Sequence, residues 1–254
     1  MKRFPSFLSI VLLLGTLVGC RPDDPDPPVA PGPPSPVVKV TVEPRWNGGA
    51  FDKNQVYVNA AGQPVKVQQL KMYLSRFRLM RPGGEVELFD ADLFGVVDGA
   101  VSRTFTLPAG DYDEVRFGLG LPPELNHGDI SQIPVNDPLG NNGGMYWSWA
   151  TMYRFVVFDG RFSNDPDPTQ PLPFTFSLHT GLDTLFRQLA FPISAQATAG
   201  DTTRLTVVVD IGHFFGNGEE VLDLSQGSQW HGTVEDLELG IRLADLQRDA
   251  ITVE

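Results

Sequence analysis

Residues 67–80 read VQQLKMYLSRFRLM, a stretch in which large apolar side chains alternate with polar ones. Leu70, Met72 and Leu74 occupy every second position, and the apolar series continues to Leu79. Alternate side chains of a β-strand point to opposite faces of its sheet, so this pattern is typical of a strand that buries one face. The stretch therefore predicts a protein built on β-sheets.

Further segments show similar strand patterns, and each is bounded by glycine, proline or aspartate. They cover residues 38–44, 85–97, 103–108, 111–121, 153–162, 173–180, 187–193 and 202–211. About nine short strands with turn signals between them predict an all-β fold, an antiparallel β-sandwich. Residues 234–250 differ, because Leu237, Ile241 and Ala244 lie near helical spacing, which predicts a short C-terminal helix.

The first twenty residues predict an export signal. Lys2 and Arg3 precede an apolar stretch that is too short and wrongly flanked for a membrane-spanning helix. Leu-Val-Gly-Cys at 17–20 matches the bacterial lipobox, in which the cysteine is lipidated after cleavage; the alternative is an ordinary signal with an incidental cysteine. We expect residues 1–20 to be a lipoprotein signal peptide and Cys20 to be the lipidation site. The protein would then lie in the periplasm or at the cell surface, lipid-anchored to the outer membrane.

Residues 21–37 are dense in proline and nearly free of large apolar side chains, so they predict an extended tether. The folded domain is expected to span residues 38–254. Cys20 is the single cysteine of the chain, so the mature protein would have no disulfide and no thiolate to bind a metal.

The mature chain is acidic. Cleavage of the signal removes Lys2 and Arg3, which leaves 17 of the 19 Lys and Arg side chains against 31 Asp and Glu, a formal charge near −14. An acidic domain repels phosphate backbones and attracts cations, so no nucleic-acid partner is expected. No Gly-x-Ser-x-Gly elbow or phosphate-binding glycine loop occurs, and the chain is not expected to be an enzyme.

The histidines are the candidate metal ligands. His179 falls on the polar side of a predicted strand, together with Ser177, where an imidazole reaches a metal or solvent; the alternative is a hydrogen-bonded surface histidine. His127, His213 and His231 occupy turn-like contexts near strand ends. No histidine pair has the spacing of a local metal motif, so any site must be assembled from distant segments.

Residues 143–155, GGMYWSWATMYRF, gather two tryptophans, two methionines and two tyrosines. In a strand, Met145, Trp147 and Trp149 would share a face, whereas in a helical turn Met145, Trp149 and Met152 would do so. Thioethers favour Cu(I), but buried methionines more commonly fill gaps in a core. The local pattern by itself favours a hydrophobic core.

Several segments resemble the MbnP-like family, which takes its name from a methanobactin-associated periplasmic copper-binding protein. They are VQQLKMYLSRFRLM at 67–80, VRFGLGLPPELNH at 115–127, GGMYWSWATMYRFVVFDG at 143–160, FTFSLHTG at 174–181 and RLADLQRDAITVE at 242–254. The resemblance spans residues 38–254, and the Met-Tyr-Trp-Ser-Trp and Phe-x-Leu-His-x-Gly segments are its most specific parts. One departure is Met152, which stands where the family pattern usually has glycine.

The resemblance implies a secreted β-sandwich that binds copper in uptake or homeostasis. It also implies a partner, a dihaem MauG-like peroxidase that oxidises a tryptophan to kynurenine. In related copper proteins a kynurenine amine and histidines hold the metal.

The candidate ligands are His179, His127 and His213, of which His179 and His127 follow from matching segments. The candidates for oxidation are Trp147 and Trp149 from the matching motif, with Trp230, beside His231, as a rival. The alternative function is a metal-free surface β-sandwich that serves as a binding or structural module. Residues 163–170 offer oxygen donors that suit calcium, although their spacing favours a solvated loop.

Overall fold

The computed structural model describes residues 33–147, 152–169, 171–232 and 236–254. The predicted signal peptide, Cys20 and most of the predicted tether lie outside the described residues, as does Trp149. Residues Pro34–Glu254 form one compact unit, which contains the whole of the predicted domain. Among the described residues, no helix is both long and apolar enough to cross a membrane.

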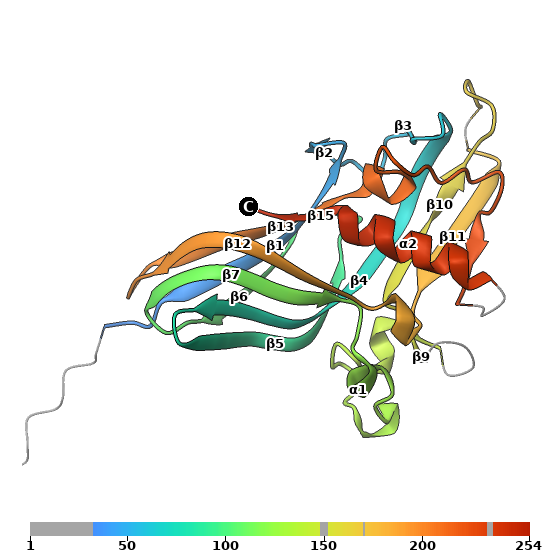
Figure 1. The fold of residues 1–254 in the computed structure, drawn as a ribbon. Helices are drawn as coiled ribbons and strands as arrows, with labels where there is room; N and C mark the ends of the chain where they lie inside the picture. The colour runs from blue at the N-terminus through green and yellow to red at the C-terminus, as the bar shows by residue number, and fades with distance from the viewer. Residues whose placement is uncertain (1–32, 148–151, 170, 233–235) are drawn as a thin grey trace, which may run out of the picture. The chain divides into compact units, whose positions relative to one another are not determined.

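The larger sheet of this unit has the strand order β12-β7-β4-β10-β11-β14, and β3 and β5 also pair with β4 (Figure 1). Most of its pairs are antiparallel, whereas β11 and β14 run parallel. Its strands are β3 (Tyr57–Val58), β4 (Pro64–Arg81), β5 (Gly84–Gly95), β7 (Gly110–Leu119), β10 (Val156–Phe162), β11 (Phe174–Thr180), β12 (Arg187–Ala197) and β14 (Gln229–Trp230).

The smaller sheet has the order β15-β13-β1-β2, with β6 also paired to β1, and β1 and β13 run parallel. Its strands are β1 (Val37–Trp46), β2 (Gly49–Ala50), β6 (Val101–Thr106), β13 (Thr202–Asp210) and β15 (Ile251–Val253). A separate hairpin consists of β8 (Tyr146–Trp147) and β9 (Met152–Tyr153). The helical segments are α1 (Pro123–Asn126), η1 (Ile130–Gln132), η2 (Asn141–Gly143), η3 (Asp183–Leu185), η4 (Ile211–Phe215) and α2 (Leu237–Asp249).

This architecture confirms the predicted all-β sandwich with a short C-terminal helix. One hydrophobic cluster contains Val40 and Val42 of β1 together with Leu70 and Met72 of β4, so the two sheets pack with their apolar faces together. Burial of these side chains is the main source of stability, because each contributes roughly 1.5–3 kcal/mol when it leaves water.

The central strand β4 includes the whole of the 67–80 stretch. Leu74 and Phe77 are both fully buried although three positions separate them, which a regular strand does not allow. The pairing of β4 with β7 shifts between Ser75 and Arg78, and Arg76 has a φ of 50°. A β-bulge therefore moves the alternation by one residue and keeps the apolar side chains directed at the core.

A second, smaller core lies on the other face of β4, because Tyr73 points away from the main cluster that contains Met72. Its other buried members include Met145, Tyr153 and Phe155, and the segment that carries α1 packs over it. The hydroxyl of Tyr73 donates to the carbonyl of Pro138 over 2.8 Å. The second core therefore holds the hairpin β8–β9 against the larger sheet.

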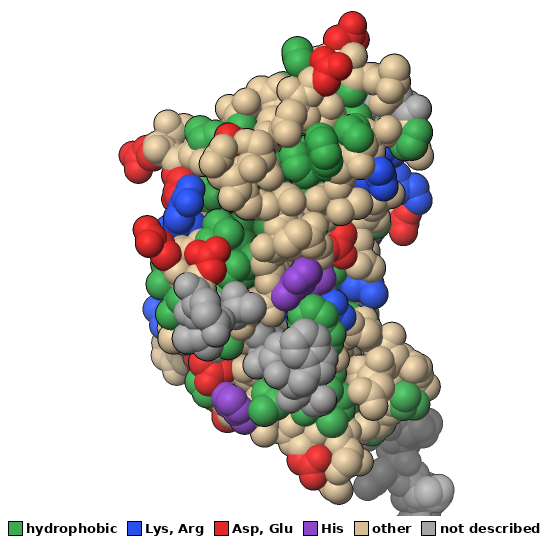
Figure 2. Space-filling model, turned by 90° about the vertical axis from the view of Figure 1, so that its right-hand side faces the viewer, with side chains coloured by type: hydrophobic (Ala, Val, Ile, Leu, Met, Phe, Trp, Pro, Cys, Tyr) green, Lys and Arg blue, Asp and Glu red, His purple; other side chains and the backbone are tan. Residues whose placement is uncertain are grey.

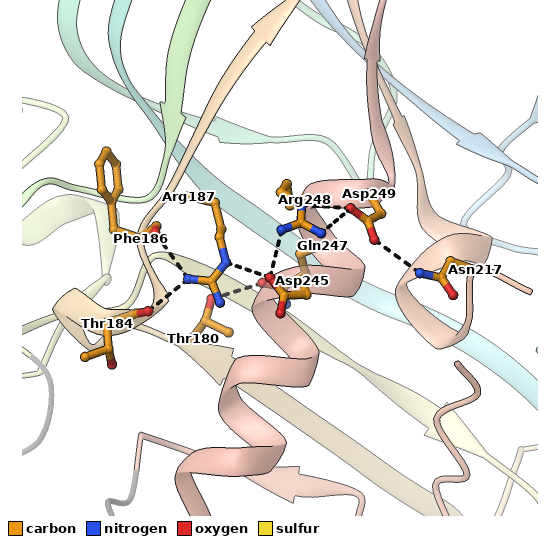
Figure 3. Close-up of polar contacts among 9 residues, drawn as sticks. All are labelled: Thr180, Thr184, Phe186, Arg187, Asn217, Asp245, Gln247, Arg248 and Asp249. Atoms are coloured by element: carbon orange, nitrogen blue, oxygen red, sulfur yellow. Dashed lines mark hydrogen bonds and ion pairs between the residues drawn. The ribbon is translucent and has the colours of Figure 1, made fainter. Parts of the chain in front are cut away.

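Helix α2 packs across one end of the larger sheet (Figure 1). Figure 3 shows the polar contacts at its C-terminal half, where Arg187 Nε donates to Asp245 over 2.8 Å. The hydroxyl of Thr180 donates to Gln247 over 3.1 Å, and both side chains are buried. Since Thr180 follows His179 directly, these contacts hold the end of β11 that carries the histidine.

Replacing Asp210 by alanine is expected to lower the free energy of unfolding by about 2–4 kcal/mol. Asp210 is 8 % exposed, and its carboxylate accepts hydrogen bonds from the backbone amides of Asn47, Gly48 and Gly212. Removal of the carboxylate leaves these amides without their acceptor. Urea unfolding should show the loss, whereas alanine at Asp113, which is exposed, should cost less than about 0.5 kcal/mol.

Candidate functional site

Three aromatic rings from distant segments meet beside the larger sheet. The ring centroid of Trp147 lies 5.8 Å from that of His179 and 5.5 Å from that of His231, and the two imidazoles are 4.9 Å apart. All three contacts are edge-on. Figure 2 shows a histidine side chain on the face drawn there, close to hydrophobic and basic side chains. We call His179, His231, Trp147, Asp159 and Ser177 the histidine cluster.

The hairpin directs Trp147 to the histidines. Tyr146 pairs with Tyr153 and Trp147 pairs with Met152 in the two short strands. The rings of Tyr146 and Tyr153 lie 5.0 Å apart at the second core. Because successive side chains alternate along a strand, Trp147 points the other way. The segment is thus a hairpin, and neither the single strand nor the helical turn considered from the sequence describes it.

The parallel pairing of β11 and β14 brings the two histidines together. Ser177 is paired with Gln229 and Leu178 with Trp230, so the next register step places His179 beside His231. Leu178 and Trp230 are buried in the main core. The histidines, one position further on, consequently point to the opposite face of the sheet.

Asp159 and Ser177 determine which ring nitrogens carry the protons. Asp159 Oδ1 accepts a hydrogen bond from Ser177 Oγ over 2.7 Å and lies 2.7 Å from His179 Nε2. An ionised carboxylate only accepts, so His179 must carry its proton on Nε2. The hydroxyl hydrogen of Ser177 is used in the bond to Asp159, so Ser177 Oγ accepts a hydrogen bond from His231 Nε2 over 2.9 Å. In their neutral form both imidazoles therefore present an Nδ1 lone pair.

The Nδ1 atom of His179 is buried and has no hydrogen-bond partner among the described residues. The whole residue is only 6 % exposed. An unpaired buried acceptor is costly, and native proteins retain such groups mostly where a ligand or an ion satisfies them. This atom is therefore the strongest sign of a ligand site in the described chain.

The electrostatics favour an ionised Asp159 and a neutral His231. Burial alone would raise the pKa of Asp159, but hydrogen bonds from His179 and Ser177 outweigh it and the pKa is lowered. Burial lowers the pKa of His231, and the nearby His179 and Arg154 lower it further against the opposing effect of Asp159. His231 is therefore a neutral imidazole at pH 7, the form that binds metals.

The other predicted ligands lie elsewhere. His127 follows α1, and its Nε2 contacts Asp183 over 2.8 Å with 54 % of the side chain exposed. His213 is exposed in η4. Within the described ranges, neither contacts the histidine cluster. Of the three predicted ligands, the structure brings only His179 into the cluster. The second histidine of the cluster is His231, which is not among the predicted ligands.

The candidate tryptophans and methionines also lie in different parts of the structure. Trp230 is buried in the main core, and its indole N–H donates to the carbonyl of Asp236 over 2.9 Å. Met145 is 1 % exposed in the second core, as expected for a methionine that fills a gap. Trp147 is only half-buried and stands against both imidazoles.

Met152 keeps the turn that the family pattern assigns to glycine. Its φ is 63°, in the left-handed region that glycine adopts most easily. The hydroxyl of Tyr146 lies 3.7 Å from its sulfur. The departure from the pattern thus changes the side chain at this position while the backbone retains a glycine-like conformation.

Among the residues that the structure describes, no three His, Cys, Asp or Glu side chains are grouped so that they could hold a metal ion. In the histidine cluster, Asp159 is bound to Nε2 of His179, away from the Nδ1 atom. The cluster therefore offers two imidazole donors, and a tightly bound metal would need a further donor.

Acidification is expected to destabilise the metal-free protein. His231 has a lowered pKa when folded, so the unfolded chain takes up a proton first as the pH falls through the ordinary histidine value of 6.5. Stability is thus retained above this value and is lost below it. Asp159, whose pKa is also lowered, adds a loss in the same direction at lower pH. Urea unfolding from pH 7.5 to about 5 should show a smaller loss for His231→Gln than for the wild type. His213→Gln, at an exposed histidine, is the matched control and should follow the wild type.

The fold and the cluster together define a β-sandwich protein with a histidine pair beside an indole ring. The family model MbnP matches residues 35–231, which include the whole histidine cluster. The chain therefore belongs to the MbnP family.

Among solved structures, the fold is similar to that of MbnP from Methylosinus trichosporium, with a TM-score of 0.52. The two sequences are 14 % identical, and the match covers 85 % of this chain and 97 % of that one. This likeness shows a shared fold. A comparison with curated proteins gives no match.

Proposed function

We propose that this protein is an exported lipoprotein, anchored through Cys20, that binds copper in uptake or homeostasis and is not itself an enzyme. The observation that carries the proposal is the pair His179 and His231. Asp159 and Ser177 hold both Nε2 atoms, and the buried Nδ1 of His179 has no partner in the described part of the chain. Imidazole nitrogen is a preferred donor for copper. A carboxylate bound to the far nitrogen of a ligating histidine is the usual support of such a ligand.

Trp147 would supply the missing donor after oxidation. Opening the indole between C2 and C3 with two molecules of hydrogen peroxide gives N-formylkynurenine and two of water. Hydrolysis then releases formate and leaves kynurenine, whose aryl amine is a nitrogen donor. The resemblance to the MbnP-like family supports a dihaem MauG-like peroxidase as the partner that performs this oxidation. The contact of Trp147 with both imidazoles supports this residue over Trp230, which is buried in the main core.

The alternative is a metal-free binding or structural module. The observation in its favour is that the described residues contain no group of three or more acidic, histidine or cysteine ligands. In that case the aromatic cluster would only stabilise the edge of the sheet.

The experiment that separates these functions is mass spectrometry and metal analysis of protein purified from its native host. Conversion of tryptophan to kynurenine exchanges one carbon for one oxygen, and fragment spectra distinguish Trp147 from Trp149 and Trp230. We expect the change at Trp147, with copper bound in proportion to it. Unmodified tryptophans and copper-free protein from both copper-starved and copper-replete cells would support the metal-free module. Mass analysis of the N-terminal peptide tests lipidation at Cys20 on the same sample.

Asparagine at Asp159 is expected to weaken copper binding by roughly 10–100-fold, because loss of a carboxylate behind a ligating histidine typically has this effect. The amide oxygen of asparagine still accepts a hydrogen bond from His179 Nε2, but the negative charge is lost. Competition with a chromogenic copper chelator measures the change. Asparagine at Asp183, the carboxylate beside His127, is the matched control and should bind copper as the wild type does.

A further inference from the structure

Arg154 covers the indole of Trp147. Its guanidinium carbon lies 4.8 Å from the ring centroid, and one terminal nitrogen donates to the carbonyl of Gly144. The backbone amide of Arg154 donates to the carbonyl of Met145 over 2.8 Å. These two bonds connect Arg154 to the residues directly before β8, the strand that carries Trp147, so the guanidinium is held over the ring.

The charge of Arg154 is not neutralised by an ion pair within the described residues. Its Nε is buried without a hydrogen-bond partner in this part of the chain, and burial lowers its pKa. Asp159 is the nearby carboxylate; its Oδ1 accepts hydrogen bonds from His179 and Ser177, and its attraction does not outweigh the effect of burial on the pKa of Arg154. The guanidinium therefore lies over the indole without an ion-pair partner in the described part of the chain.

Arg103 provides a contrast. Its guanidinium carbon lies 5.1 Å from the ring centroid of Phe94, a similar distance. Arg103, however, forms an ion pair with Asp92 over 2.6 Å. A cation over an aromatic ring is thus present twice, but only at Trp147 is it without a carboxylate partner among the described residues.

We infer that Arg154 is a positioning residue that holds Trp147 against the histidines and makes its indole harder to oxidise. A cation on the face of an aromatic ring is attracted by the negative face of the neutral ring. Loss of one electron converts the indole to a radical cation, and the attraction becomes a repulsion. The electron passes to a one-electron oxidant, which is reduced by one unit, and the indole N–H proton then passes to water.

The biological role of this resistance of Trp147 to oxidation rests on the proposed function. A tryptophan that is to be oxidised only by its partner must resist weaker oxidants, including copper itself. Arg154 gives Trp147 this resistance without changing the indole. The peroxidase would have to supply a stronger oxidant than free Cu(II).

The test uses full-length metal-free protein and photogenerated tris(bipyridine)ruthenium(III), a one-electron oxidant, with the rate of oxidation at Trp147 followed by peptide mass spectrometry. Arg154→Gln and Arg154→Met remove the charge, and Met keeps most of the apolar cover of the ring. Both should raise the rate about tenfold. Arg154→Lys keeps the charge and should stay within about twofold of the wild type. Arg103→Gln is the matched control and should leave the rate at Trp147 unchanged.

Two results would overturn the inference. Equal rates in the wild type and both uncharged variants would show that the charge has no effect on the indole. An increase in Arg154→Lys as large as in Arg154→Gln would show that the arginine only shields the ring. Because no copper and no peroxidase take part, these results are independent of the proposed function. Unmodified tryptophans in copper-free native protein would refute that function and leave the measured effect of Arg154 in place.

Discussion

Alanine at either His179 or His231 is expected to lower copper affinity by at least about a hundredfold, because the free energy of a protein metal site is shared among few ligands. The two imidazoles are the nitrogen donors that the histidine cluster offers, and their rings lie 4.9 Å apart. Loss of one leaves a single imidazole, which exposed histidines of any protein provide. Equilibrium dialysis against buffered copper, with metal analysis of the retained protein, measures the effect.

The chain supplies its own controls for this experiment. Alanine at His127 or His213 removes the same chemical group from exposed positions outside the cluster. Both variants should retain copper as the wild type does. If they lose copper while His179→Ala and His231→Ala retain it, the site lies with His127 and His213 and not with the histidine cluster. Circular dichroism confirms that each variant is folded.

The difference between the histidines predicted as ligands and the pair that the structure brings together has a physical cause. Side-chain alternation is local, so the position of His179 on the face shared with Ser177 follows from the sequence of one strand. The partner of His179 depends on which strand pairs with β11 and in which register. His231 is 52 positions away along the chain, and only the parallel pairing of Leu178 with Trp230 places it beside His179. No local spacing signals such a pairing, since β14 has only two residues.

The fold could be predicted from the sequence better than the site, because strand patterns are local whereas the site depends on the pairing of distant strands. The alternation of residues 67–80 indicates a strand that buries an apolar face, and β4 does so against the main core in the centre of the larger sheet. The second core on the other face, around Tyr73, does not follow from that alternation. The bulge at Arg76 and the hairpin that contains Trp147 depend on backbone conformations with positive φ at Arg76 and Met152. Arginine and methionine rarely adopt these conformations, so their sequence predicts neither turn.

Phenylalanine at Trp147 is expected to abolish kynurenine formation and to lower copper affinity by about as much as the loss of a histidine, at least about a hundredfold. Phenylalanine preserves an aromatic ring in contact with the imidazoles but contains no nitrogen, so no aryl amine can form. Trp147 is half-buried and belongs to neither hydrophobic cluster, and the variant should therefore remain folded. The measurement combines mass spectrometry of the 143–155 region with copper analysis after expression in the native host.

Phenylalanine at Trp149, the other tryptophan of the same motif, is the control for this variant. It should leave the oxidation of Trp147 and the retention of copper unchanged. If Trp147→Phe retains copper at the wild-type level, the third donor does not come from Trp147, and oxidation of this residue is not what completes the site. If Trp149→Phe instead loses both the modification and the metal, the oxidised residue is Trp149. The contact of Trp147 with His179 and His231 would then serve only to pack the edge of the sheet.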